Sequence, residues 1–207
     1  MADDHAGLLD ALGIPDVQVV GCSMGSIIAQ QLALRHPRRV RSLVLMCPWA
    51  HCDPQTAAIF DHLVTCRERL PPAERVRFIQ LLIHARETWD DPRWRRRFRA
   101  AQSRAAQTRP AQTRIGVRGQ AAACQSHDTR RRLADITCPT LVIGGEEDRF
   151  TPPWMAHAVA AGIPDSELHL YPGAGHAFHW ERIADFNPRI RAWLECHRRP
   201  VAAMASS

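Results

Sequence analysis

Apolar positions along the chain follow two different spacings, and each spacing predicts one kind of element. Short runs of β-branched and aliphatic residues, bounded by proline, glycine or aspartate, predict buried strands. Such runs occupy residues 17–20, 42–46 and 140–144, and the alternation of polar and apolar residues over 167–171 predicts a fourth strand with one face buried. Repeats every three or four residues predict helices, and beside the strands they occupy residues 2–12, 27–36, 152–161 and 188–196. This order predicts an α/β fold, in which strands 17–20 and 42–46 are parallel neighbours in a sheet with flanking helices.

The two terminal helices are amphipathic. In residues 2–12, the leucines Leu8, Leu9 and Leu12 fall on one face, which we expect to be buried, and Gly13 ends the helix. The expected packing stripe of the last helix consists of Ile190, Trp193 and Leu194. The tail that follows is expected to be disordered.

The middle of the chain, residues 54–128, shows no strand pattern. Its apolar residues recur at helical spacing in groups around Ile59, Val76, Phe98 and Ile115. A helical segment between two strands can either cover the mouth of a site or cover the flank of the sheet. The first interpretation is favoured, and the second stays open.

One stretch combines a strand, a sharp turn and a helix around a serine, and it reads Gly21-Cys22-Ser23-Met24-Gly25. The outer glycines allow a tight turn and close packing of strand against helix, which leaves the hydroxyl of Ser23 exposed. The helix N-terminus favours negative charge on a reacting oxygen, and the N–H of Met24 is placed to bind such an oxyanion. Ser23 is either an ordinary turn serine or a nucleophile, and the flanking strand and helix favour the nucleophile.

Two more stretches follow later strands, namely Gly144-Gly145-Glu146-Glu147-Asp148 and Gly173-Ala174-Gly175-His176. Together with the first stretch they resemble the α/β-hydrolase fold family, in its cap-bearing branch of esterases, lactonases and cofactor-free haloperoxidases. The resemblance extends from the first helix to about Trp193. It implies a catalytic triad in the order Ser23, Asp148 and His176, with serine as nucleophile, histidine as general base and aspartate as its orienting acid.

The acid has two close alternatives. Asp148 fits the family's pattern because a helix follows, in which Thr151 is expected as the N-cap and Pro152 as the first helical residue. Glu146 and Glu147 are expected to be solvated turn residues, although either could replace the aspartate if the loop is shifted.

The resemblance also indicates which histidine is the general base and which residues line the substrate pocket. His176 follows Gly175, as the family's pattern requires, whereas the nearest alternative, His179, does not. Cys22 and Met24, on either side of the nucleophile, and Trp49, just past the second strand, are expected to line the substrate pocket. The resemblance implies hydrolysis of a carboxylic ester or lactone through an acyl-enzyme, without a metal or an organic cofactor.

The resemblance also divides the chain. Residues 1–50 would carry the nucleophile half of the core, 51–134 the helical cap, 135–198 the half with acid and histidine, and 199–207 the disordered tail. Family members normally have several strands before the nucleophile strand, and a His-Gly loop there gives a second oxyanion donor. No such pair precedes the serine, so we expect an N-terminally truncated core. Loss of one oxyanion donor typically lowers the rate about a hundred- to a thousandfold.

Truncation would place the nucleophile strand at an edge of the sheet. Its unpaired N–H and C=O groups would then be available to another chain, so self-association through this edge is expected. The alternative function is therefore a catalytically weak or inactive remnant that acts as an interaction module.

Composition limits the other functional classes. The 207 residues are 45% hydrophobic, enough for one globular domain, and the net charge is +6. All 27 basic residues are arginine, and no nucleic-acid motif accompanies the clusters at 93–99 and 130–132. Solvated helix faces are therefore favoured over a nucleic-acid site.

Cysteine usage and the N-terminal sequence predict a compartment. The seven cysteines form an odd set without a C-x-x-C pair, which favours reduced thiols over disulfides or a zinc site. No apolar run predicts a signal peptide or a membrane span. We expect a cytoplasmic protein with a small-molecule ester or lactone substrate and with neither nucleic-acid nor membrane partners.

Overall fold

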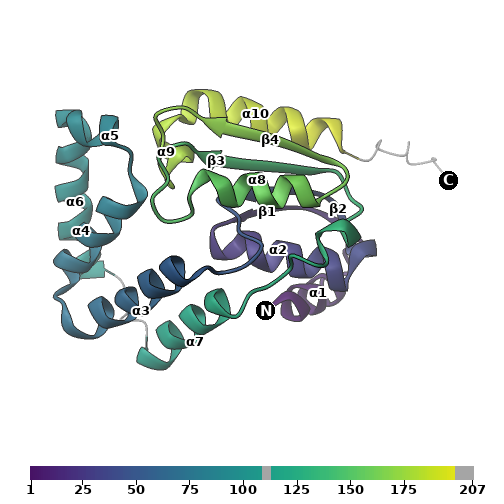
Figure 1. The fold of residues 1–207 in the computed structure, drawn as a ribbon, viewed down its shortest axis with the longest axis horizontal. Coiled ribbons are helices and arrows are strands. Elements are labelled where there is room, and N and C mark those ends of the chain that lie inside the picture. Colours follow the sequence, from purple (N-terminus) through teal and green to yellow (C-terminus); the bar gives the residue numbers. More distant parts are fainter. Residues whose placement is uncertain (109–112, 199–207) are drawn as a thin grey trace.

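A four-stranded parallel sheet forms the centre of the protein, in the order β1-β2-β3-β4 (Figure 1). The computed structural model describes residues 1–108 and 113–198. The strands are β1 (Val17–Cys22), β2 (Val40–Met46), β3 (Thr140–Gly145) and β4 (Ser166–Tyr171). All four predicted strands and the parallel pairing of the first two are confirmed. Because every strand runs the same way, the loops that follow them meet at one edge of the sheet.

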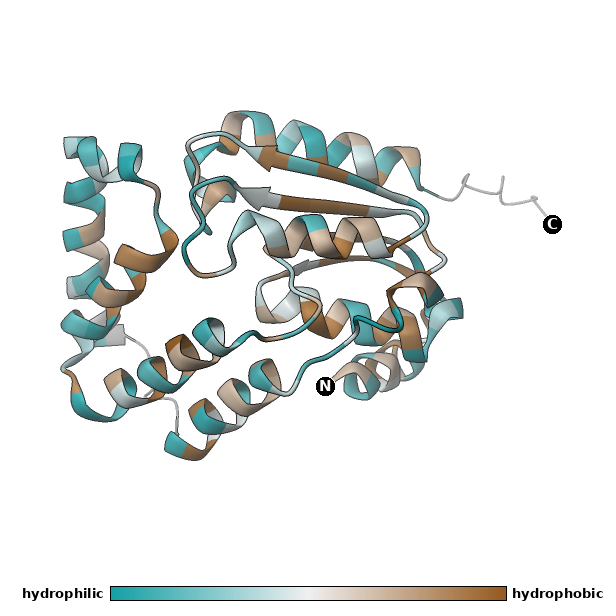
Figure 2. Cartoon of the chain, viewed as in Figure 1, coloured by the Kyte–Doolittle hydropathy of each residue, from teal (hydrophilic) through white to brown (hydrophobic). Residues whose placement is uncertain are grey.

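Helices cover both faces of this sheet (Figure 1). One face is covered by α1 (Ala2–Ala11), α2 (Met24–Arg35) and α8 (Pro153–Gly162), and the other by α9 (Phe178–Glu181) and α10 (Ile183–Cys196). Two short 3-10 helices, η1 (Pro37–Arg39) and η2 (Leu133–Asp135), lie in the connections. Fully buried Leu43 and Leu45 of β2 point to the first face, and Val44 points to the second. The strands thus lie between two helical layers, and the α/β fold class is confirmed. In Figure 2, much of β3 has the colour of hydrophobic residues, as expected of a strand that is covered on both faces.

The first helix packs through a different face from the one predicted. Its buried residues are Ala2 and Ala6, whereas Leu8 is 56% and Leu12 is 61% exposed. Small side chains let α1 lie close to α2, so the alanine face is the one that is buried. Gly13 does end the helix, with a φ of 65°.

Two helix starts also differ from prediction, and both involve proline. The last helix begins at Ile183 and contains Pro188 inside it, at the cost of one main-chain hydrogen bond. The predicted stripe of that helix is confirmed, since Trp193 is buried against the sheet with Ile190 and Leu194 packed beside it. Helix α8 begins at Pro153 with Pro152 as its N-cap, one residue later than expected.

The segment between β2 and β3 is helical, as predicted. It comprises α3 (Pro54–Arg69), α4 (Pro72–Ile83), α5 (Arg86–Asp90), α6 (Pro92–Thr108) and α7 (Arg114–Gln125). Helices α4, α5 and α6 lie beyond the C-terminal ends of the strands (Figure 1). The division at residues 51 and 134 into core and cap stays a prediction, and the expected disorder of 199–207 falls outside the described residues.

Candidate active site

The turn between β1 and α2 holds Ser23 in a strained backbone conformation. Its φ is 55° and its ψ is −119°, a region that non-glycine residues rarely occupy. The main chain is held there by hydrogen bonds, because the Ser23 N–H donates to the Met46 carbonyl over 2.8 Å and the Ser26 N–H donates to the Ser23 carbonyl over 2.8 Å. A β-carbon on Gly21 would lie 2.3 Å from the Gly25 carbonyl oxygen. The predicted close approach of strand and helix is therefore present.

The loops after β3 and β4 bring Asp148 and His176 together. The His176 Nδ1 donates to Asp148 Oδ2 over 2.7 Å, and both residues are buried. The carboxylate also accepts hydrogen bonds from the N–H groups of Phe150 and Thr151 and from the hydroxyl of Thr151. Thr151 thus holds the aspartate in place, in addition to lying 3.1 Å from the histidine ring nitrogen, and it is not the N-cap that we predicted. The sequence pattern around Thr151 indicated only the start of a helix. It did not predict that the Thr151 hydroxyl would donate a hydrogen bond to Asp148.

Burial and pairing set the charges of this pair. Burial alone would lower the pKa of His176, but the charge and hydrogen bond of Asp148 outweigh it and raise the pKa above its ordinary value. Burial alone would raise the pKa of Asp148, yet the same histidine and the bonds from Thr151 hold it below its ordinary value. The aspartate is therefore ionised at neutral pH and fixes the proton on Nδ1, which leaves Nε2 as the atom able to accept a proton.

The alternatives from the sequence lie elsewhere. Glu146 is exposed, and Glu147 accepts a hydrogen bond from the Arg86 N–H at the start of α5. His179 packs against the ring of Phe178, and burial lowers its pKa. Among the described residues, none of these three makes a hydrogen bond with His176.

The serine is the one member of the predicted triad without a direct bond to the others. Within residues 1–108 and 113–198, no hydrogen bond joins Ser23 Oγ to His176. The two lie at the same edge of the sheet, because Ser23 N–H bonds the end of β2 and Cys47 Sγ, one residue further, donates to the His176 carbonyl over 3.3 Å. Catalytic hydrogen bonds are often long without substrate and tighten when it binds.

A second acidic side chain, Glu181, fixes the loop that carries the histidine. Its buried carboxylate accepts hydrogen bonds from the N–H of Gly175 at 2.7 Å and of Ala85 at 3.0 Å, the hydroxyl of Thr88 at 2.7 Å and the Nδ1 of His84 at 3.0 Å. These donors come from two distant parts of the chain, the histidine loop and the connection from α4 into α5. Sequence reasoning missed this residue, since it belongs to none of the three motifs.

Three potential ligand atoms lie within 4.8 Å of one another, on Cys47, Asp148 and His176. The carboxylate and imidazole are already bonded to each other, and burial raises the pKa of the Cys47 thiol well above its ordinary value. A protonated thiol is a poor metal ligand. The arrangement therefore fits a hydrogen-bonded acid–base pair better than a metal centre.

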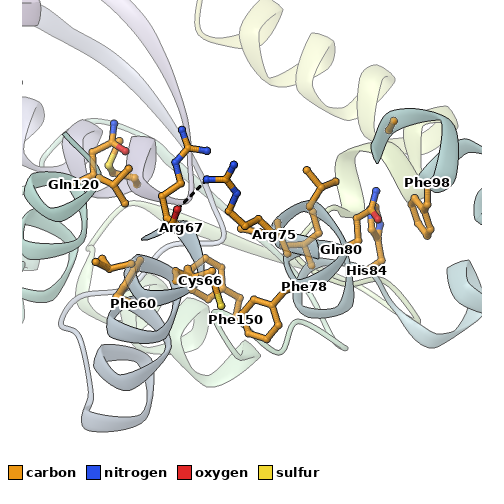
Figure 3. Close-up of a pocket in the computed structure, with 18 of the residues that line it drawn as sticks. Phe60, Cys66, Arg67, Arg75, Phe78, Gln80, His84, Phe98, Gln120 and Phe150 are labelled. Carbon is orange, nitrogen blue, oxygen red and sulfur yellow. Dashed lines mark hydrogen bonds between the residues drawn. The ribbon is translucent and has the colours of Figure 1, made fainter. Parts of the chain in front are cut away.

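A cavity of about 1070 Å³ is lined mostly by the helical segment, with Met24 of α2, Phe150 of the loop after β3 and Trp180 of α9 completing its wall. Met24, next to the nucleophile, lines it together with apolar side chains that include Phe60, Val76, Ile79 and Phe98 (Figure 3). It can therefore hold a large apolar group beside Ser23.

Of the three predicted pocket residues, Met24 lines this cavity, whereas Cys22 and Trp49 lie outside its lining. Trp49 is fully buried in the same apolar cluster as Phe60, and the centroids of the two rings lie 6.0 Å apart. Cys22 is exposed, and a side-chain hydrogen bond with Cys47 lowers its pKa to about 7. Contact of either residue with substrate stays a prediction.

Comparisons with known proteins identify the family. A sequence profile described as alpha/beta hydrolase fold matches residues 1–183. The chain is 30% identical over 194 residues to the protein named "Putative carbamate hydrolase RutD" from Variovorax paradoxus, an alignment that covers 94% of this chain and 71% of that protein. It is 31% identical over 186 residues to 2-hydroxy-6-oxo-6-phenylhexa-2,4-dienoate hydrolase from Comamonas testosteroni. That alignment covers 87% of this chain and 63% of that protein. A solved thermophilic esterase from Thermogutta terrifontis gives a TM-score of 0.78 at 26% identity, over 96% of this chain and 72% of that one.

The chain belongs to the α/β hydrolase fold family. The curated relatives are named hydrolases, which confirms the enzyme class expected from the sequence. The chain spans 71% and 63% of the lengths of these two relatives. In the part of the chain that the structure describes, no helix has the length and apolar character needed to cross a bilayer.

Proposed function

We propose that this chain hydrolyses a carboxylic ester or lactone through an acyl-enzyme formed on Ser23. One observation carries the proposal: an ionised, buried Asp148 holds His176 by Nδ1 at the sheet edge where the strained turn presents Ser23. A serine becomes a good nucleophile only with such an oriented base nearby. The expected order of triad residues along the chain agrees with this assignment.

The reaction would use each group in turn. The Ser23 oxygen attacks the carbonyl carbon while its proton passes to His176 Nε2, and the Met24 N–H stabilises the oxyanion. The histidine then protonates the leaving alkoxide, and the acyl group remains on the serine. A water molecule, deprotonated by the same histidine, releases the acid and regenerates the serine. The first step requires the serine hydroxyl and the imidazole to move into hydrogen-bond reach when substrate binds.

Support for an ester or lactone comes from chemistry and from similarity. The apolar cavity beside Met24 suits a large acyl or alcohol group. The esterase of known structure is similar over 96% of this chain. The carbamate and dienoate hydrolases among the relatives show that the scaffold also serves other bonds, so the ester assignment is the part of the proposal that the substrate assay decides.

The test is covalent labelling of the purified chain with a fluorophosphonate probe, together with hydrolysis of p-nitrophenyl esters. Ser23→Ala should abolish both, because it removes the hydroxyl that we propose as the nucleophile. Ser103→Ala is the matched control, since that serine is exposed on α6 and its hydroxyl donates to the Arg99 carbonyl of the same helix. Circular dichroism checks that both variants are folded. Equal labelling of Ser23→Ala and wild type would overturn the proposal.

A further inference from the structure

Among the described residues that line the cavity, the arginines are not balanced by any acidic side chain. The lining includes four arginines, namely Arg67, Arg75, Arg97 and Arg104, and no aspartate or glutamate from the described residues. The remaining lining is mostly apolar. A cavity that combines cationic and apolar walls is complementary to a ligand that is both anionic and apolar.

Two of these arginines form a defined pair. Arg67, near the end of α3, and Arg75, at the start of α4, lie side by side in Figure 3, and both are half-buried. The Arg75 Nη1 donates to the Arg67 carbonyl oxygen over 2.9 Å, so the backbone of α3 fixes the direction of the Arg75 side chain.

The environment of Arg75 favours an anion. Among the residues that the structure describes, its buried Nε has no hydrogen-bond partner, and a donor left in that state is costly. Loss of hydration, followed by the positive charge of Arg67, lowers the pKa of Arg75. A carboxylate has two oxygens that match the fork of a guanidinium, and its charge would offset the repulsion between the two cations.

We propose that the substrate carries a carboxylate at the end remote from the bond that is cleaved, and that Arg75 and Arg67 bind it. This inference rests on the proposed ester hydrolysis at Ser23. The chain between the two ends would be apolar, because Phe60, Val76 and Ile79 line the same cavity. The substrate class is thus an ester of an aliphatic acid with a second, ionised carboxyl group.

The test compares two substrates that differ only in charge. The mono-p-nitrophenyl ester of suberic acid carries a free carboxylate, and its methyl-capped analogue is neutral. In the wild type, kcat/KM should favour the anionic ester. Arg75→Gln should lower this preference about ten- to a hundredfold, chiefly through KM, because one charge-assisted bond is lost. Arg77→Gln is the matched control, since that arginine lies on the same helix, is exposed and does not line the cavity.

A direct binding measurement separates this inference from the catalytic proposal. Calorimetry should show that octanoate binds wild type and Ser23→Ala more tightly than octanol, and that Arg75→Gln removes the difference. If esters are cleaved without any charge preference, the carboxylate site is wrong and the hydrolase proposal stands. If no ester is cleaved but octanoate binding depends on Arg75, the site stands and the hydrolase proposal fails. Tighter binding of octyl phosphate than of octanoate would contradict the choice of a carboxylate.

Discussion

The protonation of His176 is set by one neighbour, and this makes the pH dependence of the reaction predictable. Asp148 raises the pKa of the imidazole above the ordinary value of 6.5, and the ring must be neutral to act as a base. We therefore expect kcat/KM for a neutral ester to rise with pH along a limb whose apparent pKa lies above 6.5. Asp148→Asn removes the charge, so the limb should move to lower pH and kcat should fall by about 10⁴-fold.

The control for this pH profile is Glu146→Gln in the same loop. Glu146 is exposed and does not bond the histidine, so both the limb and kcat should stay as in the wild type. A larger effect at Glu146 than at Asp148 would mean that the acid has been assigned to the wrong carboxylate.

Glu181 gives the second prediction at the residue scale. Its side chain is fully buried and accepts four hydrogen bonds, one of them from Gly175 next to the histidine. Glu181→Gln keeps the shape but turns one oxygen into a donor, so at least one partner loses its acceptor. We expect the free energy of unfolding to fall by about 1–3 kcal/mol and kcat to fall with little change in KM, because the imidazole is displaced.

Denaturant unfolding and steady-state kinetics measure these two effects. Glu195→Gln, an exposed change on α10, should alter neither. A loss of stability without a loss of kcat would show that Glu181 supports the fold alone and does not position the base.

At the scale of elements, the sequence predicts what depends on local pattern. Strands β1, β2 and β3 are mostly apolar runs and β4 alternates polar with apolar residues, while the turn at Ser23 carries its own glycines, so these elements can be predicted without tertiary information. Helix starts at Pro152 and Pro188 are shifted, because proline is allowed at several positions near a helix start and can also lie inside a helix that packing stabilises. The prediction of which face of α1 is buried is wrong, because whether its alanines or its leucines are buried depends on how closely α2 approaches.

The same distinction applies to the site. Ser23, Asp148 and His176 stand in motifs that are local in sequence. The roles of Thr151 and Glu181 depend on hydrogen bonds to partners distant in the chain, which no spacing along the sequence reveals. The positive charge of the cavity could not be predicted from the sequence either, since arginines of separate helices come together only in the folded chain.

The turn between β1 and α2 gives the prediction at this scale. A β-carbon at Gly21 would lie 2.3 Å from the Gly25 carbonyl oxygen, whereas one at Gly25 meets nothing within 4 Å. Gly21→Ala should therefore lower the free energy of unfolding by at least about 1–3 kcal/mol. Gly25→Ala should leave it unchanged or raise it by up to about 1 kcal/mol, because alanine favours a helix. Equal stability of the two variants in urea unfolding would show that strand and helix can move apart.

At the scale of the whole molecule, the strand that leads to the nucleophile lies at the edge of the sheet. Among the described residues, β1 pairs with β2 alone, so its other side has unpaired main-chain groups. Val20 in this strand is 46% exposed. Edge strands with apolar side chains can pair with a second copy of the chain, and natural proteins often prevent this with lysine.

We therefore expect self-association that increases with protein concentration and depends on this edge. Val20→Lys should shift sedimentation-velocity profiles toward the monomer, because pairing would bring two like charges together and bury them. Ile115→Lys is the matched control: that isoleucine is 85% exposed on α7, so its change adds the same charge away from the sheet edge. If both variants sediment like the wild type at every concentration, the edge of β1 does not mediate association. If Ile115→Lys alone dissociates the protein, the contact lies on the helical segment instead.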